Sequence, residues 1–357
     1  MDTNQIFQKK LDNHNNMLFN LIDHIPIGMK MKYEEIKKRM KGVVVVQTTP
    51  FNEDGTVDME GMRSNTRWLA DFAEGKDFVL IPLGSTGEFY AMSEAERKAV
   101  IKAVVEETAG KALVFPGAGA AGTREAVDMC TYAESVGADG VQVVIPYYHI
   151  PEEEGMYLHY KKISESVGPD FGIMVYNNPV TSGSWVNPLL MKKISKLPNV
   201  VALKENILDV WLYHAMHAAI DPGDAIVMTG SGEIAASYIA VYGCQGFITM
   251  TANFAPDISY DVYEAIKARD FEKTARICRE RCEPFDVFLG KLQENHGPHT
   301  GARSYWGGVE GFMYVGALKA AMDIVGLRGG DVRLPLIGLD KKEKEEMKEV
   351  LKDMRVI

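Results

Sequence analysis

Eight short apolar runs, spread over residues 43–250, restrict what this chain can fold into more than any other feature of its sequence. The runs are rich in β-branched residues and continuously apolar, as expected of parallel strands that are covered on both faces. They begin at Val43, Phe78, Ala112, Val141, Phe171, Val200, Ala225 and Gly246. Successive starts lie roughly 20–35 residues apart, which leaves room for a crossover helix after each strand. The pattern predicts an α/β fold, a closed (β/α)8 TIM barrel rather than an open sheet.

Helical patterns fill the intervals between the runs and continue after the last one. Ser93 and Glu96 have the spacing of a capping box, which predicts a helix start, and Gly137 is expected to end the next helix. Four helical segments without intervening strands follow, over residues 257–270, 271–292, 312–326 and 340–354. The last is highly charged, and we interpret it as a solvated helix with one apolar face, made of Met347, Val350, Leu351 and Met354.

These boundaries predict three parts in the chain. An N-terminal extension covers residues 1–41 and contains a short helix at 31–40, the catalytic barrel covers 42–256, and a C-terminal helical region covers 257–357.

The overall composition disfavours several classes of protein. The formal net charge of −10 disfavours nucleic-acid binding, because an acidic surface repels phosphate backbones. No apolar run reaches the roughly 18–20 residues of a membrane span, and the N-terminus lacks the order of a secretory signal, so we expect a cytoplasmic protein. The four cysteines are interpreted as ordinary reduced thiols, since no ligand cluster completes a zinc site around Cys278 and Cys282.

Polar residues terminate four of the predicted strands. They are the GSTGE segment at residues 84–88, the PYY segment at 146–148, the YNNP segment at 176–179 and the KEN segment at 204–206. The active site of a (β/α)8 barrel lies at the C-terminal ends of its strands, so we expect these segments to meet at one mouth.

Lys204 is the most unusual of these polar residues, because it ends a strand whose other residues are apolar. Burial disfavours an ammonium, so the pKa of Lys204 should fall. A depression of roughly 3 units would supply a free amine at neutral pH, and a free amine attacks a ketone to give an iminium. The alternative is a lysine whose stem packs in the barrel while its head reaches water.

Tyr176 is a candidate to move protons to and from such an intermediate. A phenol normally titrates near 10, so it needs hydrogen-bonded neighbours, and Thr86 and Tyr148 are the candidates for that relay. The loop at residues 84–87 offers backbone N–H groups and two hydroxyls to a small carboxylate.

The chain resembles the dihydrodipicolinate synthase / N-acetylneuraminate lyase family. The matching motifs are TTPFNEDGTVD at residues 48–58, GSTGEF at 84–89, PYY at 146–148, VYNNP at 175–179, ALKEN at 202–206 and GLRGGDVRLPL at 326–336. Their order and spacing agree with the family, including the 28 residues that separate Tyr176 from Lys204.

This resemblance implies a barrel with a C-terminal helical domain, assembled as a homotetramer of tight dimers, with no metal or organic cofactor. It implies a Schiff base between Lys204 and pyruvate or another 2-oxo acid, with Tyr176 shuttling protons. Ser85 and Thr86 match the residues that hold the pyruvyl carboxylate and relay protons. Tyr148 matches a tyrosine that reaches into the neighbouring subunit's site.

Two departures from the family pattern bear on the second substrate. Thr181 stands where the synthase branch has a carboxylate-binding arginine, and a neutral side chain cannot form that bidentate clamp. Glu233 alone remains of the acidic pair of the sialic acid lyase branch, while TANFAP at residues 251–256 resembles the 2-keto-3-deoxy sugar acid aldolases. We expect Ser85, Thr86, Thr181, Glu233 and Thr249 to bind substrate.

The expected activity is therefore aldol cleavage, condensation or dehydration of a 2-keto-3-deoxy sugar acid or related compound, with an aldehyde or sugar acid as the partner of the 2-oxo acid. Dihydrodipicolinate synthase, N-acetylneuraminate lyase and a non-catalytic 2-oxo acid sensor remain alternatives. The G-x-G-x-x-G pattern at residues 117–122 suggests a dinucleotide site, but it follows the third predicted strand, and no acidic residue ends the next strand.

Overall fold

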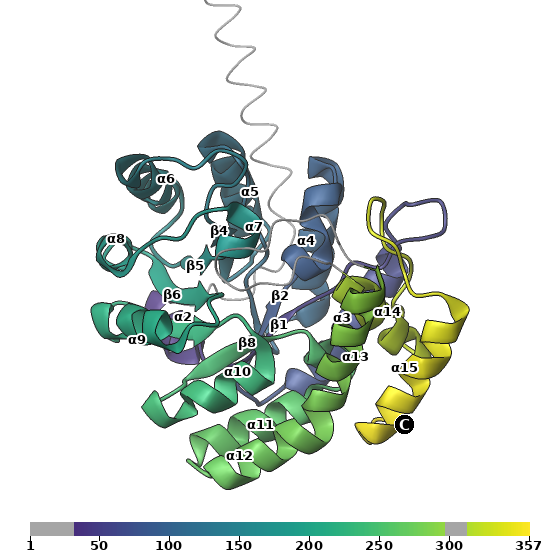
Figure 1. Cartoon of the computed structure of the whole chain (residues 1–357). Coiled ribbons are helices and arrows are strands. Elements are labelled where there is room, and N and C mark those ends of the chain that lie inside the picture. The colour runs from purple at the N-terminus through teal and green to yellow at the C-terminus, as the bar shows by residue number, and fades with distance from the viewer. Residues whose placement is uncertain (1–31, 297–312) are drawn as a thin grey trace, which may run out of the picture. The chain divides into compact units, whose positions relative to one another are not determined.

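Eight parallel strands form the single sheet of the computed structural model, which describes residues 32–296 and 313–357 (Figure 1). The strands are β1 Gly42–Val46, β2 Phe78–Ile81, β3 Leu113–Val114, β4 Gly140–Val144, β5 Gly172–Asn177, β6 Val200–Glu205, β7 Ile226–Thr229 and β8 Gly246–Thr249. Their order in the sheet is β3-β2-β1-β8-β7-β6-β5-β4, so the first strand pairs with the last. Each strand overlaps one of the predicted apolar runs, and the predicted α/β barrel is confirmed.

The barrel closes between β3 and β4 through residues that follow β3. Gly117 forms a parallel bridge with Gln142, whose N–H donates to the carbonyl of Pro116 at 3.0 Å. A Cβ atom on Gly117 would lie 1.9 Å from the carbonyl oxygen of Leu83. The glycine therefore allows the backbones to approach closely enough for closure.

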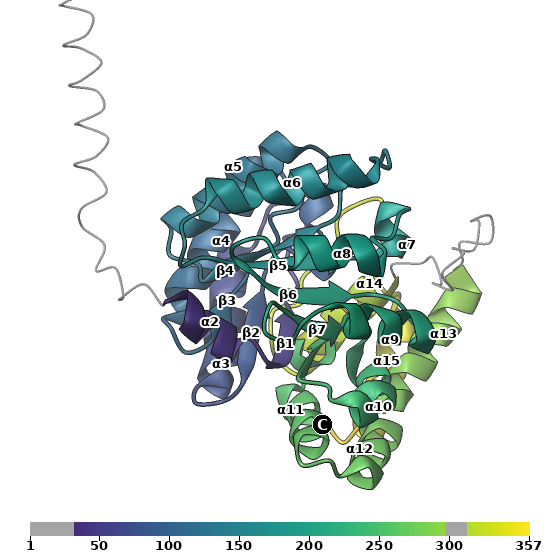
Figure 2. The same ribbon diagram turned by 90° about the vertical axis from the view of Figure 1, so that its left-hand side faces the viewer.

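Helices cover the outside of the barrel between successive strands (Figure 2). They are α3 Met59–Ala73, α4 Glu94–Thr108, α5 Thr123–Ser135, α6 Glu153–Ser166, α7 Pro179–Ser182, α8 Pro188–Ile194, α9 Val210–Ala219 and α10 Gly232–Ile239. The predicted capping box of Ser93 and Glu96 is present at the start of α4. Gly137 has a φ of 91°, in the left-handed region that favours glycine after a helix.

Side chains alternate between the two faces of the sheet, as they must in a strand. Inward-facing residues such as Val44, Met174, Met228 and Ile248 form one buried cluster. The helix α2, Tyr33–Arg39, adds Ile36 to this cluster, and the hydroxyl of Tyr33 donates to the carbonyl of Val200 at 3.1 Å. This helix thus closes the end of the barrel at which β6 begins.

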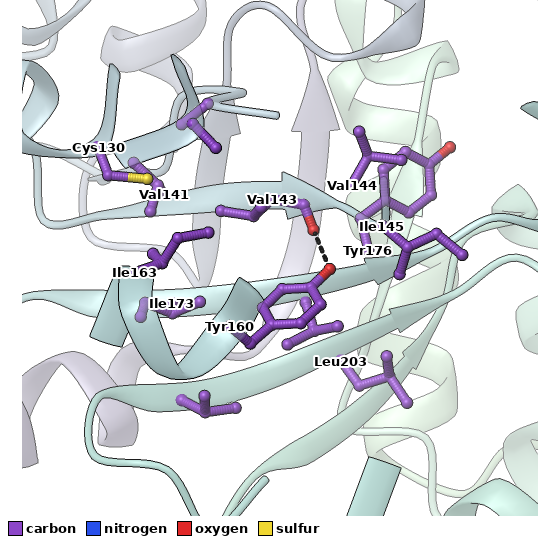
Figure 3. Packing of buried hydrophobic residues seen from close by; sticks show 14 of the residues in the cluster. Cys130, Val141, Val143, Val144, Ile145, Tyr160, Ile163, Ile173, Tyr176 and Leu203 are labelled. Carbon is purple, nitrogen blue, oxygen red and sulfur yellow. Dashed lines mark hydrogen bonds between the residues drawn. The ribbon is translucent and has the colours of Figure 1, made fainter. Parts of the chain in front are cut away.

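Outward-facing residues pack against the helices in larger clusters. Figure 3 shows part of one, in which the hydroxyl of Tyr160 on α6 donates to the carbonyl of Val143 at 3.0 Å. A residue's position along its strand therefore decides whether it faces the barrel interior or the helical layer.

The C-terminal helices extend the helical layer beside β8 and β1. They are α11 Pro256–Lys267, α12 Phe271–Ile277, α13 Glu283–His296, α14 Met313–Ile324 and α15 Lys341–Asp353, with a π-helical segment Cys278–Cys282 between α12 and α13. Met347, Leu351 and Met354 of the last helix are buried and Val350 is partly buried, which confirms its predicted apolar face. Within the described residues, no helix is both long and apolar enough to cross a membrane.

Candidate active site

Lys204 and Tyr176 lie side by side at the C-terminal ends of β6 and β5. The strand register pairs Val144 with Tyr176, Tyr176 with Lys204 and Lys204 with Met228, so all four stand at one level (Val144 and Tyr176 are labelled in Figure 3). The Nζ atom of Lys204 lies 3.7 Å from the centroid of the Tyr176 ring, and each residue is only 4% exposed. The two groups are thus held in contact in a place that excludes most water.

Burial lowers the pKa of Lys204 to about 7. Among the described residues, no carboxylate forms an ion pair with this ammonium, so nothing offsets the loss of hydration. A pKa near neutrality means that a large fraction of the side chain is a free amine at physiological pH. A free, desolvated lysine amine is the nucleophile that imine chemistry requires.

The space beside Lys204 comes from a missing side chain on the next strand. A Cβ atom on Gly230, which follows β7, would lie 2.0 Å from Oδ1 of Asn206 and 3.1 Å from Cε of Lys204. The first distance is too short for any real pair of atoms, so a larger residue at 230 would displace Asn206 and crowd the lysine stem. Glycine at this position keeps the amine free to change from ammonium to imine.

Tyr176 is a buried phenol with defined hydrogen-bond partners. Nδ2 of Asn178 donates to its hydroxyl oxygen at 2.6 Å, and Ser85 also hydrogen-bonds to it. Burial raises the pKa of Tyr176 above its ordinary value, while the hydrogen bonds from Ser85 and Asn178 oppose that rise. The group is therefore a protonated phenol at neutral pH, able to donate a proton to a neighbouring atom.

The two hydroxyls of the GSTG loop separate in the structure. They belong to a 3-10 turn, Ser85–Gly87, in which consecutive side chains point about 120° apart. Ser85 hydrogen-bonds to Tyr176, whereas the buried Thr86 hydrogen-bonds to Tyr314 of α14. The side chain in direct contact with the Tyr176 hydroxyl is thus Ser85, and the expected assistance by Thr86 stays a prediction.

Tyr314 was missed by the sequence analysis altogether. It lies on a helix beyond the barrel, and no local motif marks it as a neighbour of the GSTG loop. Its contact with Thr86 depends on how α14 packs, which spacing along the chain does not reveal.

A buried ion pair fastens the same loop to the C-terminal helices. Glu88, in a left-handed conformation with φ of 54°, accepts from Nζ of Lys319 on α14 at 2.5 Å. Its other oxygen accepts from the backbone N–H of Arg333 at 2.9 Å. The position of Ser85 and Thr86 therefore depends on residues of the C-terminal region.

Tyr148, in contrast to the buried Tyr176, lies at the surface. Its side chain is 89% exposed and lies edge-on to the ring of His149. Its φ of 82° is unusual for a residue with a side chain, and such strain concentrates at functional positions. Tyr148 is thus displayed on the surface of the chain.

Three of the predicted substrate-binding residues have other surroundings than Lys204. Thr181 is exposed on α7, where its N–H donates to Oδ1 of Asn178 at 3.4 Å. Oγ1 of Thr249 donates to Glu233 at 2.6 Å, and the hydroxyl of Ser259 on α11 donates to the same carboxylate oxygen.

Thr249 follows the inward-facing Ile248 and therefore faces the helical layer. Glu233 and Thr249 belong to a buried polar cluster on the outer side of β8, and this placement argues against their expected contact with substrate.

The glycines of the G-x-G-x-x-G pattern serve close packing at the end of β3. A Cβ atom on Gly119 would lie 2.4 Å from Cγ1 of Val144, and Gly117 closes the barrel as described above. The carbonyls of Gly117 and Gly119 accept from the guanidinium of Arg97 at 3.2 and 3.1 Å. These backbone contacts explain the first two glycines of the pattern.

Comparisons with known proteins place the chain in a family of the kind that the barrel and its buried lysine suggest. The model of the Dihydrodipicolinate synthetase family matches residues 39–292. The 4-hydroxy-tetrahydrodipicolinate synthase of Methanopyrus kandleri is 33% identical over 317 residues, which are 88% of this chain and 95% of that relative. The enzyme of the same name from Archaeoglobus fulgidus is 31% identical, over 89% of this chain and 99% of that relative.

Solved structures of the same class superpose on most of the chain. A monomeric dihydrodipicolinate synthase variant matches with a TM-score of 0.76 and 30% identity, covering 90% of this chain and 99% of that one. Dihydrodipicolinate synthase from Aquifex aeolicus matches with a TM-score of 0.72 and 27% identity, covering 88% and 98%.

A TIM barrel with a buried amine at the end of its sixth strand and a tyrosine at the end of its fifth defines a lyase of the class I pyruvate aldolase type. Within that class, the chain belongs to the dihydrodipicolinate synthetase family.

Proposed function

We propose that Lys204 condenses with the 2-oxo group of pyruvate or a related 2-oxo acid and that the resulting iminium drives the reaction. The observation that carries this proposal is the buried amine, with a pKa of about 7 and 3.7 Å from the Tyr176 ring. The amine adds to the carbonyl carbon, the carbinolamine loses water, and the iminium accepts the electron pair of the bond that breaks. The enamine formed in this way takes a proton at C3, and hydrolysis of the resulting imine returns the 2-oxo acid and the free lysine.

Tyr176 is proposed to move protons at two points of this sequence. It donates to the departing hydroxyl of the carbinolamine, and it exchanges a proton with the oxygen of the second substrate. The hydrogen bond between Ser85 and Tyr176 links the phenol to the loop at residues 84–87 and gives the proton a neighbouring hydroxyl. The backbone N–H groups and hydroxyls of residues 84–87 are proposed to bind the carboxylate of the 2-oxo acid, as in other backbone anion sites.

We propose a polyhydroxylated second substrate, such as a 2-keto-3-deoxy sugar acid that is cleaved or dehydrated. Thr181 is neutral and exposed at the place where the synthase branch is expected to hold a carboxylate with arginine. Synthesis of 4-hydroxy-tetrahydrodipicolinate is the second candidate, because the relatives reported above bear that name. Its second substrate, aspartate semialdehyde, carries a carboxylate that Thr181 cannot clamp.

We also propose that the chain assembles as a homotetramer, a dimer of dimers, through two exposed surfaces. Tyr148 and Ile150, which follow β4, are 89% and 64% exposed. A second apolar surface spans α9 and α10, where the rings of His214 and Tyr242 lie 5.5 Å apart. Its most exposed members are Leu208, Val210, Trp211, Tyr238, Val241 and Tyr242. Exposed apolar patches of this kind mark protein contacts, and light scattering with Trp211→Glu would show a smaller assembly.

Borohydride trapping tests the proposed chemistry. Incubation with pyruvate and borohydride should add one reduced pyruvyl group, located by peptide mass spectrometry at Lys204. An unmodified Lys204 would contradict the proposal. A panel of keto-deoxy sugar acids, N-acetylneuraminate and aspartate semialdehyde, coupled to release or consumption of pyruvate, then identifies the second substrate. Turnover of aspartate semialdehyde above that of the sugar acids would favour the synthase instead.

A further inference from the structure

Asn178 lies between Tyr176 and the short helix α7, and its two amide atoms have different partners. One atom accepts from the backbone N–H groups of Val180 at 3.1 Å and Thr181 at 3.4 Å. A backbone N–H can only donate, so this atom is the amide oxygen. The remaining atom is Nδ2, and it lies 2.6 Å from the hydroxyl oxygen of Tyr176. The helix cap therefore fixes which end of the amide faces the phenol.

This orientation determines the direction of the hydrogen bond at Tyr176. An amide nitrogen can donate but cannot accept, so the phenol oxygen must accept from Asn178. The phenol's own hydrogen is then left for Ser85 or for a bound substrate. A hydrogen bond donated to this oxygen strengthens when the oxygen becomes negative, which favours loss of the proton.

Asn178 has little freedom to adopt another orientation. Its side chain is 3% exposed, and Pro179 fixes the first residue of α7. The end of α7 is held as well, because the hydroxyl of Ser182 donates to the carbonyl of Ile145 at 3.3 Å. A rotated amide would place its nitrogen against two N–H groups, so the donation to Tyr176 is built into the helix cap.

We propose that Asn178 is a positioning residue that directs the proton of Tyr176 into the barrel and stabilises the phenolate formed during proton transfer. This inference rests on the proposed function, in which Tyr176 shuttles protons for the Lys204 imine. It assigns to the second asparagine of the YNNP segment a role in the reaction beyond capping a helix. The first asparagine has no such role, because Asn177 faces Glu205 and Val186.

Two substitutions distinguish the hydrogen bond that Asn178 donates to Tyr176 from its capping of α7. Asn178→Asp and Asn178→Ser each keep an oxygen that can cap α7, because Asp and Ser are favourable N-cap residues. An ionised Asp cannot donate to Tyr176, and the shorter Ser does not reach it. Asn177→Ala is the matched control, since it removes an equally buried amide that does not contact Tyr176.

The experiment measures two steps with pyruvate alone. Borohydride trapping reports formation of the Lys204 imine, and NMR in D2O reports deuteration of the pyruvate methyl group, which requires proton transfer from that imine. Both Asn178 variants should keep the trapped adduct within about threefold of the wild type. Their deuteration rates should fall ~10- to 100-fold, the size typical of an outer partner of a functional group. In Asn177→Ala the deuteration rate relative to the amount of trapped adduct should stay at its wild-type value.

If Asn178→Ser deuterated pyruvate at the wild-type rate, the inference would be overturned, and Asn178 would serve only as the N-cap of α7. Equal losses of adduct, deuteration and thermal stability would also overturn it, because they indicate a structural role. Absence of an adduct in the wild-type protein would instead refute the proposed function, so the two failures are distinguishable.

Discussion

Among the residues that the structure describes, two lysines are almost completely buried, and they have opposite surroundings. Lys204 and Lys319 are 4% and 1% exposed, and each ammonium nitrogen lies over an aromatic ring, that of Tyr176 at 3.7 Å and that of Phe51 at 4.5 Å. Lys319 also donates to the Glu88 carboxylate and to the carbonyl of Asp331 at 2.6 Å. Lys204 has burial alone, which lowers its pKa to about 7.

The difference lies in the anion that accompanies one buried lysine and not the other. For Lys319, burial lowers the pKa while the charge of Glu88 opposes that effect, so the pair remains an internal tie between the GSTG loop and α14. For Lys204, the same loss of hydration is uncompensated and yields an amine. The presence of one carboxylate thus distinguishes Lys319 from Lys204, the lysine that we propose as the nucleophile.

The largest expected effect is the pH dependence of imine formation. The ammonium form of Lys204 cannot attack a ketone, so the rate of borohydride-trapped adduct formation should fall about tenfold for each pH unit below 7. Above that pH the rate should level off. Quenched reactions with pyruvate between pH 5 and 9 measure this profile. A rate that keeps rising to pH 10 would show that Lys204 has the pKa of an ordinary lysine.

Lys319→Met should destabilise the fold strongly without removing the nucleophile. It leaves the Glu88 carboxylate buried and unpaired, at a cost of about 3–5 kcal/mol in the free energy of unfolding. Denaturant unfolding measures this loss, and Lys319→Met with Glu88→Gln should recover part of it, since both charges are then gone. Borohydride should still label Lys204 in the folded variant. If pyruvate and borohydride labelled Lys319 in the wild-type protein, or failed to label Lys204 in the folded variant, the contrast between the two lysines would be wrong.

Lys204→Met should abolish the adduct and make the folded state more stable at neutral pH. The folded-state pKa of about 7 lies below the unfolded value of 10.5, so the unfolded chain binds more protons between these pH values. The destabilisation by Lys204 is therefore fully present below about pH 7 and disappears as pH rises toward 10.5. The variant should gain up to about 4 kcal/mol at pH 7. An equal gain at pH 10.5 would point to packing rather than protonation.

Thr249→Val should have the smallest effect. It removes one buried hydrogen bond to Glu233, at a cost of about 1 kcal/mol in stability. Because Thr249 faces the helical layer, the KM for the 2-oxo acid should not change. Thermal unfolding and steady-state kinetics check both points, and a raised KM with unchanged stability would return Thr249 to the substrate site.

Sequence reasoning found the residues whose place follows from local rules. Lys204 and Tyr176 end consecutive apolar runs, and parallel strands in a barrel end at the same mouth. Their chemistry also follows from residue type, because a lysine among apolar residues must lose hydration.

The remaining site residues depend on geometry that spacing does not determine. Thr249 ends a strand as Lys204 does, yet a shift of one residue along a strand exchanges the barrel interior for the helical layer. Ser85 and Thr86 are adjacent, and only the 3-10 turn decides which of them meets Tyr176. Tyr314 and Lys319 reach the loop through the packing of a distant helix.

Gly230 has a consequence for attempts to engineer a reactive lysine into other barrels. Placing a lysine at the end of a strand of another barrel does not by itself reproduce this site, because here the residue that follows the neighbouring strand is a glycine, and a Cβ atom there would lie 3.1 Å from Cε of the lysine. Directed evolution that started from Gly230→Ala would have to move Asn206 before it could recover activity. The smallest residue in the protein therefore limits which sequences near this one can still carry a working catalyst.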